Sequence, residues 1–376
     1  MTARILLSCG EPSGDLSAGA LTRELQRLLP GVRVSGLGGP QCAAAGGELI
    51  EDYRGLAVTG FTEAIPKIPH LLGVRRKLVA SAQRERPDVL VVVDFPDFNF
   101  RLAPLIRKLG IPVVYYVSPQ IWAWRRGRLK SIRTFANLVL VIFPFEEAIY
   151  REAGVPVEFV GHPLVELVKR ATDRGAFLGR LGLAATAPTI AVLPGSRSNE
   201  VGRILPRLLA AAERIRAAIP AAQFLFARAP HLEDALFTEA RQLARSVIVE
   251  HETDSVLASS DVALVASGTA TVQAALHDTP MVVVYRLSAM TYRLVRPLVR
   301  VNAVAMVNLI AGTRIVPELI QDDFTPDAVA GEAVSILTDR GRAARIRNQL
   351  ADVRHKLGEP GASRRAAEAI LELVRK

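Results

Sequence analysis

Short runs of aliphatic residues recur along the chain, each followed by a polar loop and then by apolar residues at helical spacing. The clearest run is Val89–Val93, in which four of the five residues are valine. A continuous β-branched run of this length is typical of a strand buried on both faces of a parallel sheet. Asp94 ends the run, and Pro96 cannot continue a central strand. The pattern therefore predicts a buried strand with a carboxylate at its carboxyl end.

The same alternation of strand, loop and helix extends over two halves of the chain. In the first half we expect strands at Ile5–Ser8, Val32–Leu37, Val89–Val93, Ile111–Val117, Leu138–Ile142 and Val157–Val160. In the second half we expect them at Thr189–Leu193, Gln223–Ala227, Val247–Glu250, Val262–Val265 and Met281–Tyr285. Helices are expected at Leu16–Leu29, near Leu102–Leu109 and from Ile204 to Ile219. Such alternation favours an α/β fold of two Rossmann-like domains that face a cleft.

The predicted domain boundaries follow the two series of strands. We expect an N-terminal Rossmann-like domain over residues 1–168 and a C-terminal one over residues 189–345, joined by the polar stretch Lys169–Pro188. Residues 346–376 are expected to form C-terminal helices, the last of which carries Ala366, Ala367, Ile370 and Val374 on one face. These helices pack either on the N-terminal domain or on a partner chain. The sequence leaves the oligomeric state open, with a homodimer as one option.

Composition excludes several classes of protein. A length of 376 residues with half of them hydrophobic suits a globular protein of about two domains. No apolar run reaches the roughly 18–20 residues of a membrane helix, and Ile5–Leu7 is too short for a signal sequence. Two cysteines, Cys9 and Cys42, indicate neither a disulfide framework nor a zinc site. The cytoplasm is the expected compartment.

A net charge of +10, mostly from arginine, favours an anionic partner such as a phosphorylated ligand or an anionic membrane surface. Nucleic acid is disfavoured because no zinc-finger spacing, RNP signature or basic heptad segment occurs. Two segments combine cations with an apolar stripe. One begins at Pro66 and has Lys67, Arg75, Arg76 and Lys77 beside Leu71, Val74 and Leu78; the other has Arg126, Lys130 and Arg133 opposite Leu129, Ile132 and Ala136. Each stripe either contacts a membrane or faces the core.

The loops after the predicted strands carry the candidate chemistry. The loop Gly10–Asp15 lacks the G-x-G-x-x-G spacing and no loop ends in Gly-Lys-Ser/Thr, which disfavours a dehydrogenase or a P-loop ATPase. Pro194–Arg197 instead places Gly195 and Ser196 at a strand-to-helix turn, where free amides and the helix dipole favour phosphate. Arg197 adds a planar fork for phosphate oxygens. Ser267–Thr269 forms a second such turn, so the C-terminal half is predicted to bind an anion.

At this level of detail the chain resembles the lipid-A-disaccharide synthase family, inverting glycosyltransferases with a GT-B fold. The resemblance rests on motifs that follow one another along nearly the whole chain: GEPSGD (10–15), GGP (38–40), DFPDFN (94–99), YVSPQIWAWR (116–125), NLVLVIFPFE (137–146), GHP (161–163), LPGSRSNEV (193–201), ASGTAT (266–271) and VNLIAG (307–312). The combination of WAWR with LPGSR is specific.

The resemblance implies transfer of 2,3-diacylglucosamine from UDP-diacylglucosamine to 2,3-diacylglucosamine 1-phosphate (lipid X), at the cytoplasmic face of the inner membrane. The products are a β-1,6-linked disaccharide 1-phosphate and UDP, and no cofactor or metal is implied. Asp94 matches the family's general base, and Arg197 would stabilise the departing UDP. The implied substrate-binding residues are Glu11, Ser13, Asp15 and Asn99 in the first half, and Ser196, Gly268, Thr269, Gln273 and Asn308 in the second.

Three points stay open. Gln273 stands where many GT-B enzymes have a glutamate that accepts hydrogen bonds from both ribose hydroxyls, and an amide offers only one acceptor oxygen. His162 is either a buried turn histidine or a ligand contact. The pair Asp94 and Asp97 suggests a metal, but we favour none because arginine and helix ends already supply positive charge. Two other functions are alternatives: an isomerase similar to UDP-GlcNAc 2-epimerase, and a non-catalytic nucleotide-sugar or lipid-binding protein.

Overall fold

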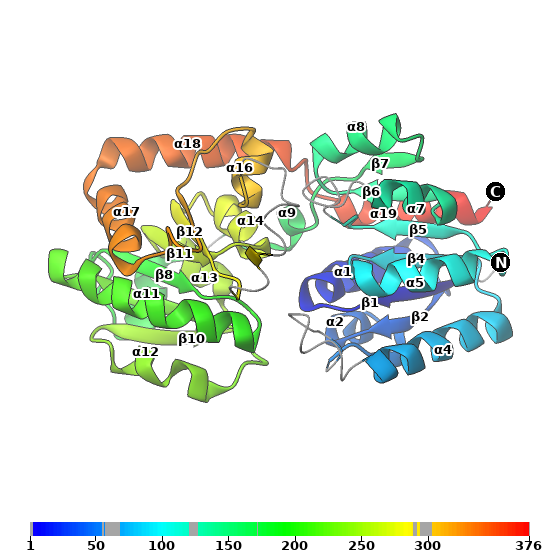
Figure 1. Ribbon diagram of the computed structural model, residues 1–376, viewed down its shortest axis with the longest axis horizontal. Coiled ribbons are helices and arrows are strands. Elements are labelled where there is room, and N and C mark those ends of the chain that lie inside the picture. Colours follow the sequence, from blue (N-terminus) through cyan, green and yellow to red (C-terminus); the bar gives the residue numbers. More distant parts are fainter. Residues whose placement is uncertain are drawn as a thin grey trace. The chain divides into compact units, whose positions relative to one another are not determined.

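The computed structural model describes residues 3–54, 56, 68–119, 127–170, 172–288, 292–293 and 303–375. The chain forms two compact units (Figure 1). The first unit ends at Glu166 and resumes at Leu357, and the second takes the described chain from Leu167 to Lys356. The C-terminal residues therefore fold with the N-terminal ones.

The first unit is built on a parallel sheet in the order β3-β2-β1-β4-β5-β6-β7. The strands are β1 (Arg4–Cys9), β2 (Arg33–Gly38), β3 (Glu48–Asp52), β4 (Val89–Val93), β5 (Val113–Tyr116), β6 (Leu138–Val141) and β7 (Val157–Phe159). Every residue of β4 is buried, as expected for a central strand covered on both faces. The strand order reverses between β1 and β4.

Helices cover both faces of this sheet. They are α1 (Pro12–Leu28), α2 (Pro40–Ala44), α4 (Ile68–Glu85), α5 (Pro96–Arg107), α7 (Arg128–Phe135), α8 (Pro144–Glu152), α9 (Leu164–Leu167) and α19 (Ala362–Arg375). On one face, α4, α5 and α7 pack side by side and bury Leu78, Leu102 and Phe135 in a single core with the strands. Another layer contains α2, α1 and α19, and α19 packs along α1.

The second unit repeats this design with the parallel order β10-β9-β8-β11-β12-β13. Its strands are β8 (Thr189–Leu193), β9 (Gln223–Arg228), β10 (Ser246–Glu250), β11 (Val262–Ala266), β12 (Met281–Tyr285) and β13 (Glu318–Ile320). The strand order reverses between β8 and β11, so the sheet of each unit has one topological switch point.

The helices of the second unit are α10 (Arg174–Arg180), α11 (Ser198–Ala218), α12 (Thr238–Gln242), α13 (Thr253–Ala258), α14 (Thr269–Leu276), α16 (Met306–Ala311), α17 (Pro326–Thr338) and α18 (Arg340–Lys356), with a 3₁₀ turn at Asp234–Phe237. Helix α11 packs along α17, which also contacts β11 and β12. Helix α14 contacts β11, α16 and α18.

The predicted fold class, two parallel-sheet α/β domains, is confirmed. The predicted strands occur within two residues of their expected ends, whereas the short edge strands β3 and β13 were not expected. Helix α5 begins at Pro96, six residues before its expected start at Leu102, so most of the DFPDFN motif lies in the first turn of a helix.

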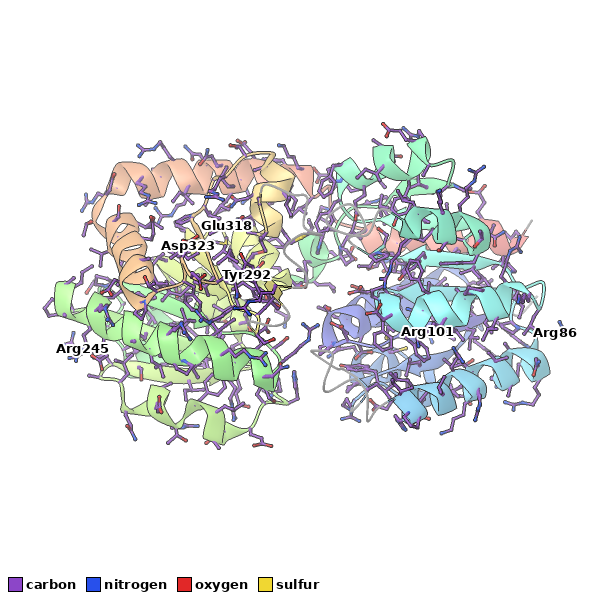
Figure 2. All side chains as sticks on the ribbon, in the orientation of Figure 1. Arg86, Arg101, Arg245, Tyr292, Glu318 and Asp323 are labelled. Carbon is purple, nitrogen blue, oxygen red and sulfur yellow. The ribbon has the colours of Figure 1, made fainter. Side chains whose placement is uncertain are left out.

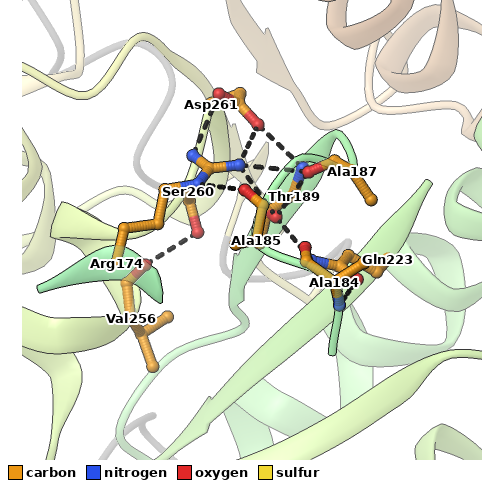
Figure 3. A network of polar contacts seen from close by, with 9 residues as sticks. All are labelled: Arg174, Ala184, Ala185, Ala187, Thr189, Gln223, Val256, Ser260 and Asp261. Carbon is orange, nitrogen blue, oxygen red and sulfur yellow. Dashed lines mark hydrogen bonds and ion pairs between the residues drawn. The ribbon is translucent and has the colours of Figure 1, made fainter. Parts of the chain in front are cut away.

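The polar stretch Lys169–Pro188, expected as a connection, contains α10 and is bound to the second sheet (Figure 3). The guanidinium of Arg174 donates to both oxygens of Asp261, at 3.1 and 2.9 Å. The same guanidinium donates to the carbonyls of Ala185 and Ala187, and Asp261 also accepts from the N–H of Thr189 at 2.8 Å. This half-buried ion pair therefore fixes α10 to the start of β8 and β11.

The apolar stripes of the two basic segments face the core. In α4, Val74 and Leu78 are buried and Leu71 packs against the same core; in α7, Ile132 is buried with Leu129 and Ala136 beside it. Packing of these stripes on the core is confirmed. Membrane contact through them was wrong, because the same apolar side chains are packed against the sheet. Residues 66, 67 and 126 of these segments lie outside the described residues, as do residues 120–125 of the YVSPQIWAWR motif.

Exposed arginine and lysine side chains nevertheless lie on the surfaces of both units. Figure 2 labels Arg86 and Arg101 on the first unit and Arg245 on the second, all of them exposed. Arg76, Lys77, Lys130 and Arg133 are exposed on α4 and α7, and Lys77 pairs with Glu51 at 2.6 Å. No helix within the described ranges is both long and apolar enough to cross a membrane.

Candidate functional site

The loops singled out in the sequence lie at the two reversal points of strand order. In the first sheet Cys9 pairs with Val93, so the loop that starts at Gly10 lies beside Asp94. In the second sheet Leu193 pairs with Val265, which brings the Pro194–Arg197 and Ser267–Thr269 turns to adjacent strand ends. Ligands of open α/β sheets bind outside the carboxyl ends of the strands at this reversal. Each unit thus has its polar loops where its topology favours a ligand.

The turn that carries Asp94 is strained and firmly held. Asp94 and the next residue, Phe95, both have left-handed backbone angles, with φ of 46° and 48°. Such angles are unfavourable for residues other than glycine and persist only where the surroundings impose them. Here the carbonyl of Asp94 accepts hydrogen bonds from the Asn99 amide at 2.8 Å and from the Tyr115 hydroxyl at 3.1 Å. The turn leaves the Asp94 side chain half-buried at the sheet edge.

Both partners of the Asp94 carbonyl are themselves buried. Burial first, and then the Asp94 charge, raise the pKa of the Tyr115 phenol, which therefore remains a donor. Asn99 is fully buried, and its Oδ1 accepts from the Ser8 hydroxyl at 2.7 Å. The predicted substrate-binding residue Asn99 thus contacts the turn that carries Asp94.

Gly10 gives the first loop room to approach this turn. A Cβ at position 10 would lie 2.2 Å from the ring of Phe95, which stacks on Phe98 with ring centroids 5.3 Å apart. A side chain at Gly10 would therefore displace Phe95 and the turn that it belongs to. Close packing between the two loops requires glycine at this position.

The other predicted residues of the first loop lie at the start of α1. Glu11 is the residue that precedes the helix, with extended backbone, and Ser13 is half-buried in the first turn. Asp15 is 1% exposed, and its carboxylate ties α1 to the start of α2. It accepts three backbone hydrogen bonds, from the N–H groups of Gly39 at 2.9 Å, Gln41 at 2.9 Å and Cys42 at 3.1 Å.

Asp97 points to a partner of its own. Its carboxylate pairs with Arg128 of α7, whose guanidinium also lies 4.8 Å from the ring centroid of Phe100. Asp97, three residues after Asp94, is therefore paired with a cation. Across the described part of the chain, no three His, Cys, Asp or Glu side chains are grouped closely enough to share a metal ion.

The Pro194–Arg197 turn precedes α11, a helix of 21 residues. Gly195 has φ of 123°, and a Cβ there would lie 2.3 Å from a carboxylate oxygen of Glu200. That carboxylate accepts from the Ser196 N–H at 3.2 Å, and the Ser196 carbonyl accepts from His231 at 2.6 Å. An oxyanion thus already contacts an amide of this turn, which is the interaction that a phosphate would make. Arg197 is half-buried at the position preceding the helix.

The second turn precedes α14. Gly268 has φ of 159° and, like Thr269, is exposed. One turn further along, Gln273 is half-buried, and its Nε2 donates to Asp254 of α13 at 2.7 Å. Asp254 has no motif to mark it in the sequence, and its proximity to Gln273 arises only from the packing of α13 beside α14.

Asn308 differs from the exposed loop residues because its side chain is buried and hydrogen-bonded to other residues of the chain. It is 1% exposed; its Nδ2 donates to the Val316 carbonyl at 3.0 Å and to Glu318 at 2.7 Å. Its Oδ1 accepts from the N–H groups of Ile315 at 2.8 Å and Val316 at 3.1 Å. All hydrogen-bonding positions of the amide are occupied, so it holds the segment between α16 and β13 in place.

Two further polar residues lie after β6 and β7 in the first unit. His162 is 5% exposed, its Nδ1 accepts from the Leu164 N–H at 3.2 Å, and burial lowers its pKa to about 3. It is therefore a neutral turn histidine. Glu146 is fully buried and accepts from the Ser118 hydroxyl at 3.3 Å and from the Phe143 N–H at 3.2 Å. Sequence reasoning did not single out Glu146, whose only signal is its place at the end of a motif.

Comparison with known proteins gives consistent results. The family model "Lipid-A-disaccharide synthetase" matches residues 5–373. The lipid-A-disaccharide synthase of Anaeromyxobacter dehalogenans (strain 2CP-C) is 46% identical over 379 residues, covering 100% of this chain and 98% of the relative. That of Myxococcus xanthus (strain DK1622) is 44% identical, covering 99% of this chain and 97% of the relative.

Solved structures are similar in fold at low identity. The calicheamicin glycosyltransferase CalG4 matches with a TM-score of 0.62 at 17% identity, over 100% of this chain and 99% of its own. UDP-GlcNAc 2-epimerase from Neisseria meningitidis, bound to UDP-GlcNAc, matches with a TM-score of 0.67 at 11% identity, over 99% of this chain and 100% of its own. A transferase and an epimerase share this architecture, so the fold by itself does not separate the two activities.

Proposed function

Because the chain belongs to the lipid-A-disaccharide synthetase family, we propose that it joins UDP-2,3-diacylglucosamine to 2,3-diacylglucosamine 1-phosphate. The 6-hydroxyl of the acceptor attacks C1 of the donor sugar, the bond from C1 to the UDP oxygen breaks, and the configuration at C1 inverts. The products are the β-1,6-linked disaccharide 1-phosphate and UDP. Identity above 40% over whole chains named lipid-A-disaccharide synthase favours this reaction over the epimerase and binding-protein alternatives.

The chemistry of the loops at the two reversals of strand order indicates which residues would carry out this reaction. Both units place their polar loops at the reversal of strand order, but the two sets of loops differ in chemistry. The first unit offers a half-buried carboxylate, Asp94, on a rigid turn, and the second offers amides, helix starts and Arg197. A base and an anion site are the two components that glycosyl transfer from a nucleotide requires.

We propose that Asp94 is the general base. It would accept the proton of the acceptor 6-hydroxyl as that oxygen attacks C1. Asn99 and Tyr115 would serve this role indirectly, because they hold the Asp94 carbonyl and thereby the direction of the side chain. Asp97 is the less suitable base because its carboxylate is paired with Arg128.

We propose that the second unit binds the UDP group. The amides at Gly195 and Ser196, the Gly268–Thr269 turn and the Arg197 guanidinium would meet the pyrophosphate, whose negative charge grows as the bond to C1 breaks. Helix dipoles and arginine can stabilise this charge without a metal ion. A bound pyrophosphate would replace the Glu200 carboxylate at the Ser196 amide.

The remaining predicted residues divide by their surroundings. Glu11 and Ser13, at the start of α1 beside Asp94, are proposed to contact the acceptor. Asp15 and Asn308 use their side chains on the chain itself, so their proposed contribution is to hold α2 and the segment before β13 in place.

We also propose that the protein works at an anionic membrane surface, at the cytoplasmic face of the inner membrane, because both substrates carry acyl chains. The net charge of +10 and the exposed cations of α4 and α7 support electrostatic attachment. Each cation near such a surface contributes on the order of 1 kcal/mol, screened by salt.

The test of the assignment compares Asp94→Asn with Asp97→Asn. Loss of a positioned general base should slow turnover by about 10²–10⁴-fold in Asp94→Asn. Asp97→Asn should cost much less, while both variants should bind UDP like the wild type. Similar losses of turnover in the two variants would refute Asp94 as the base.

A further inference from the structure

The carboxylate of Asp254 binds two side chains at once, one from α14 and one from the residue that follows this helix. Gln273 donates to Oδ1 through Nε2 at 2.7 Å, and the Nε2 of His277 lies 3.0 Å from the same oxygen. His277 directly follows the last residue of α14 and is one helical turn from Gln273, so the two side chains lie on the same side of the helix. The second oxygen of Asp254 accepts from the N–H of Lys169 at 3.0 Å. Asp254 is therefore held from three directions.

This arrangement fixes which end of the Gln273 amide faces Asp254. A carboxylate only accepts hydrogen bonds, so the NH₂ end of the amide must point toward Asp254 and the ring nitrogen of His277 must donate. Burial raises the pKa of Asp254, but the hydrogen bonds from His277, Gln273 and Lys169 outweigh it and the pKa is lowered overall. Asp254 is thus ionised at neutral pH, and the Oε1 of Gln273 is directed away from it.

The position of Gln273 relates this orientation to a ligand. It lies in the second turn of α14, the helix that begins at the Gly268 turn and follows β11 at the reversal of strand order. A nucleotide whose phosphates lie on the two turns carries its ribose next to them, and ribose hydroxyls donate to a carbonyl oxygen. No hydrogen bond within the described chain engages Oε1 of Gln273.

We propose that Asp254 is a positioning residue that presents Oε1 of Gln273 to a ribose hydroxyl of the donor nucleotide, and so makes the protein selective for ribose. The proposal rests on the UDP-binding role of the second unit. It also explains the glutamine: a glutamate at position 273 would place a second carboxylate at hydrogen-bonding distance from Asp254. Two like charges at that separation repel, so glutamine and Asp254 belong together.

The experiment measures binding of UDP and of 2′,3′-dideoxyuridine 5′-diphosphate by calorimetry. The wild type should prefer UDP by about tenfold, the worth of one hydrogen bond. In Asp254→Asn, which can donate as well as accept, the Gln273 amide is free to reverse, and the preference should fall below about threefold. Binding of the dideoxy nucleotide should change little, which separates loss of ribose recognition from loss of the whole site.

The second pair of variants exchanges the partners. Gln273→Glu alone should bind UDP more weakly than the wild type because of repulsion by Asp254. Adding Asp254→Asn to it should restore the preference for UDP, because the amide introduced at position 254 donates to the new carboxylate. Asp261→Asn is the matched control: Asp261, like Asp254, is a partly buried carboxylate that accepts hydrogen bonds from a side chain and from a backbone N–H, as Figure 3 shows. It should lower the melting temperature and leave the preference unchanged.

The outcomes separate this inference from the proposed function. Wild-type protein that binds neither nucleotide would refute UDP binding, and this inference with it. Asp254→Asn that binds UDP with the full wild-type preference would overturn the inference alone. So would Gln273→Glu that binds UDP as well as the wild type does.

Discussion

Asn99→Asp tests the support of the Asp94 turn with a change of a single group, NH₂ to oxygen. Asn99 is fully buried, donates to the Asp94 carbonyl at 2.8 Å and lies 3.4 Å from the Ser8 carbonyl. An ionised carboxylate at position 99 would place a negative oxygen against two carbonyl oxygens. Of the three groups that contact the Asn99 side chain here, the Ser8 hydroxyl is the one that could donate a hydrogen bond to it. We expect the folded variant to keep this new carboxyl group protonated, so that its O–H replaces the lost N–H.

Protonation sets the size of the effect. An aspartate in the unfolded chain has a pKa of about 3.9, and each pH unit above it costs about 1.4 kcal/mol when the folded state stays neutral. The variant should therefore lose about 4 kcal/mol of stability at pH 7 but only about 1.5 kcal/mol at pH 5. The sign follows from a folded-state pKa raised above the unfolded value, which makes the deficit grow as pH rises.

Urea unfolding at pH 5 and pH 7, compared with the wild type at each pH, measures this difference. Asn99→Leu is the control, since it removes the hydrogen bonds without adding a titrating group and should lose the same stability at both pH values. An Asn99→Asp deficit that is equal at pH 5 and pH 7, or below about 1 kcal/mol at both, would show that the folded protein does not keep a carboxyl group at position 99 protonated.

Three further predictions concern other parts of the chain. Burial lowers the pKa of His162 to about 3, from about 6.5 in the unfolded chain. Between about pH 7.5 and pH 5 the free energy of unfolding of the wild type, measured with urea, should therefore fall by about 2 kcal/mol more than that of His162→Asn. Equal decreases would contradict a neutral buried histidine. Arg197→Ala should weaken UDP binding and slow transfer together, while EDTA leaves the wild-type rate unchanged; a rate abolished by EDTA and restored by Mg²⁺ would point to a metal mechanism. Reversing the charge of Arg75, Arg76 and Lys77 should release the protein from anionic vesicles in a low-salt sedimentation assay without changing turnover on detergent-dispersed substrate; equal binding of the wild type to neutral vesicles would argue against electrostatic attachment.

The strands that could be predicted are those whose residues are continuously buried and β-branched, such as Val89–Val93, because burial on both faces leaves a clear apolar run. The sequence did not predict β3, Glu48–Asp52, whose five residues are three carboxylates around Leu-Ile and are at most half-buried. An edge strand is stabilised by pairing with its neighbour, which leaves little trace in its own composition. The destination of the last helix was open for a related reason: an apolar face shows that α19 packs on something, but not that it packs on α1.

For the candidate site, the sequence predicts which loops lie together but not which contacts their side chains make. Strand ends and glycine turns mark where Asp94 and Arg197 lie, because topology alone brings such loops together. The interactions that decide what the side chains do join distant segments: Asn99 to Ser8, Asp15 to Gly39, and Gln273 to Asp254. No local pattern encodes these pairs. For the same reason the sequence did not reveal that the side chain of Asn308 is hydrogen-bonded within the chain.

The proposed function requires the chain to form a glycosidic bond between two acylated glucosamines. Purified protein should be incubated with UDP-2,3-diacylglucosamine, with and without 2,3-diacylglucosamine 1-phosphate, and the products analysed by mass spectrometry, with Asp94→Asn in parallel. We predict a disaccharide 1-phosphate and UDP in equal amounts, only when the acceptor is present, and about 10²–10⁴-fold more slowly with the variant. An epimerised UDP-sugar formed without acceptor, or tight binding of both substrates with no product, would contradict the proposed function.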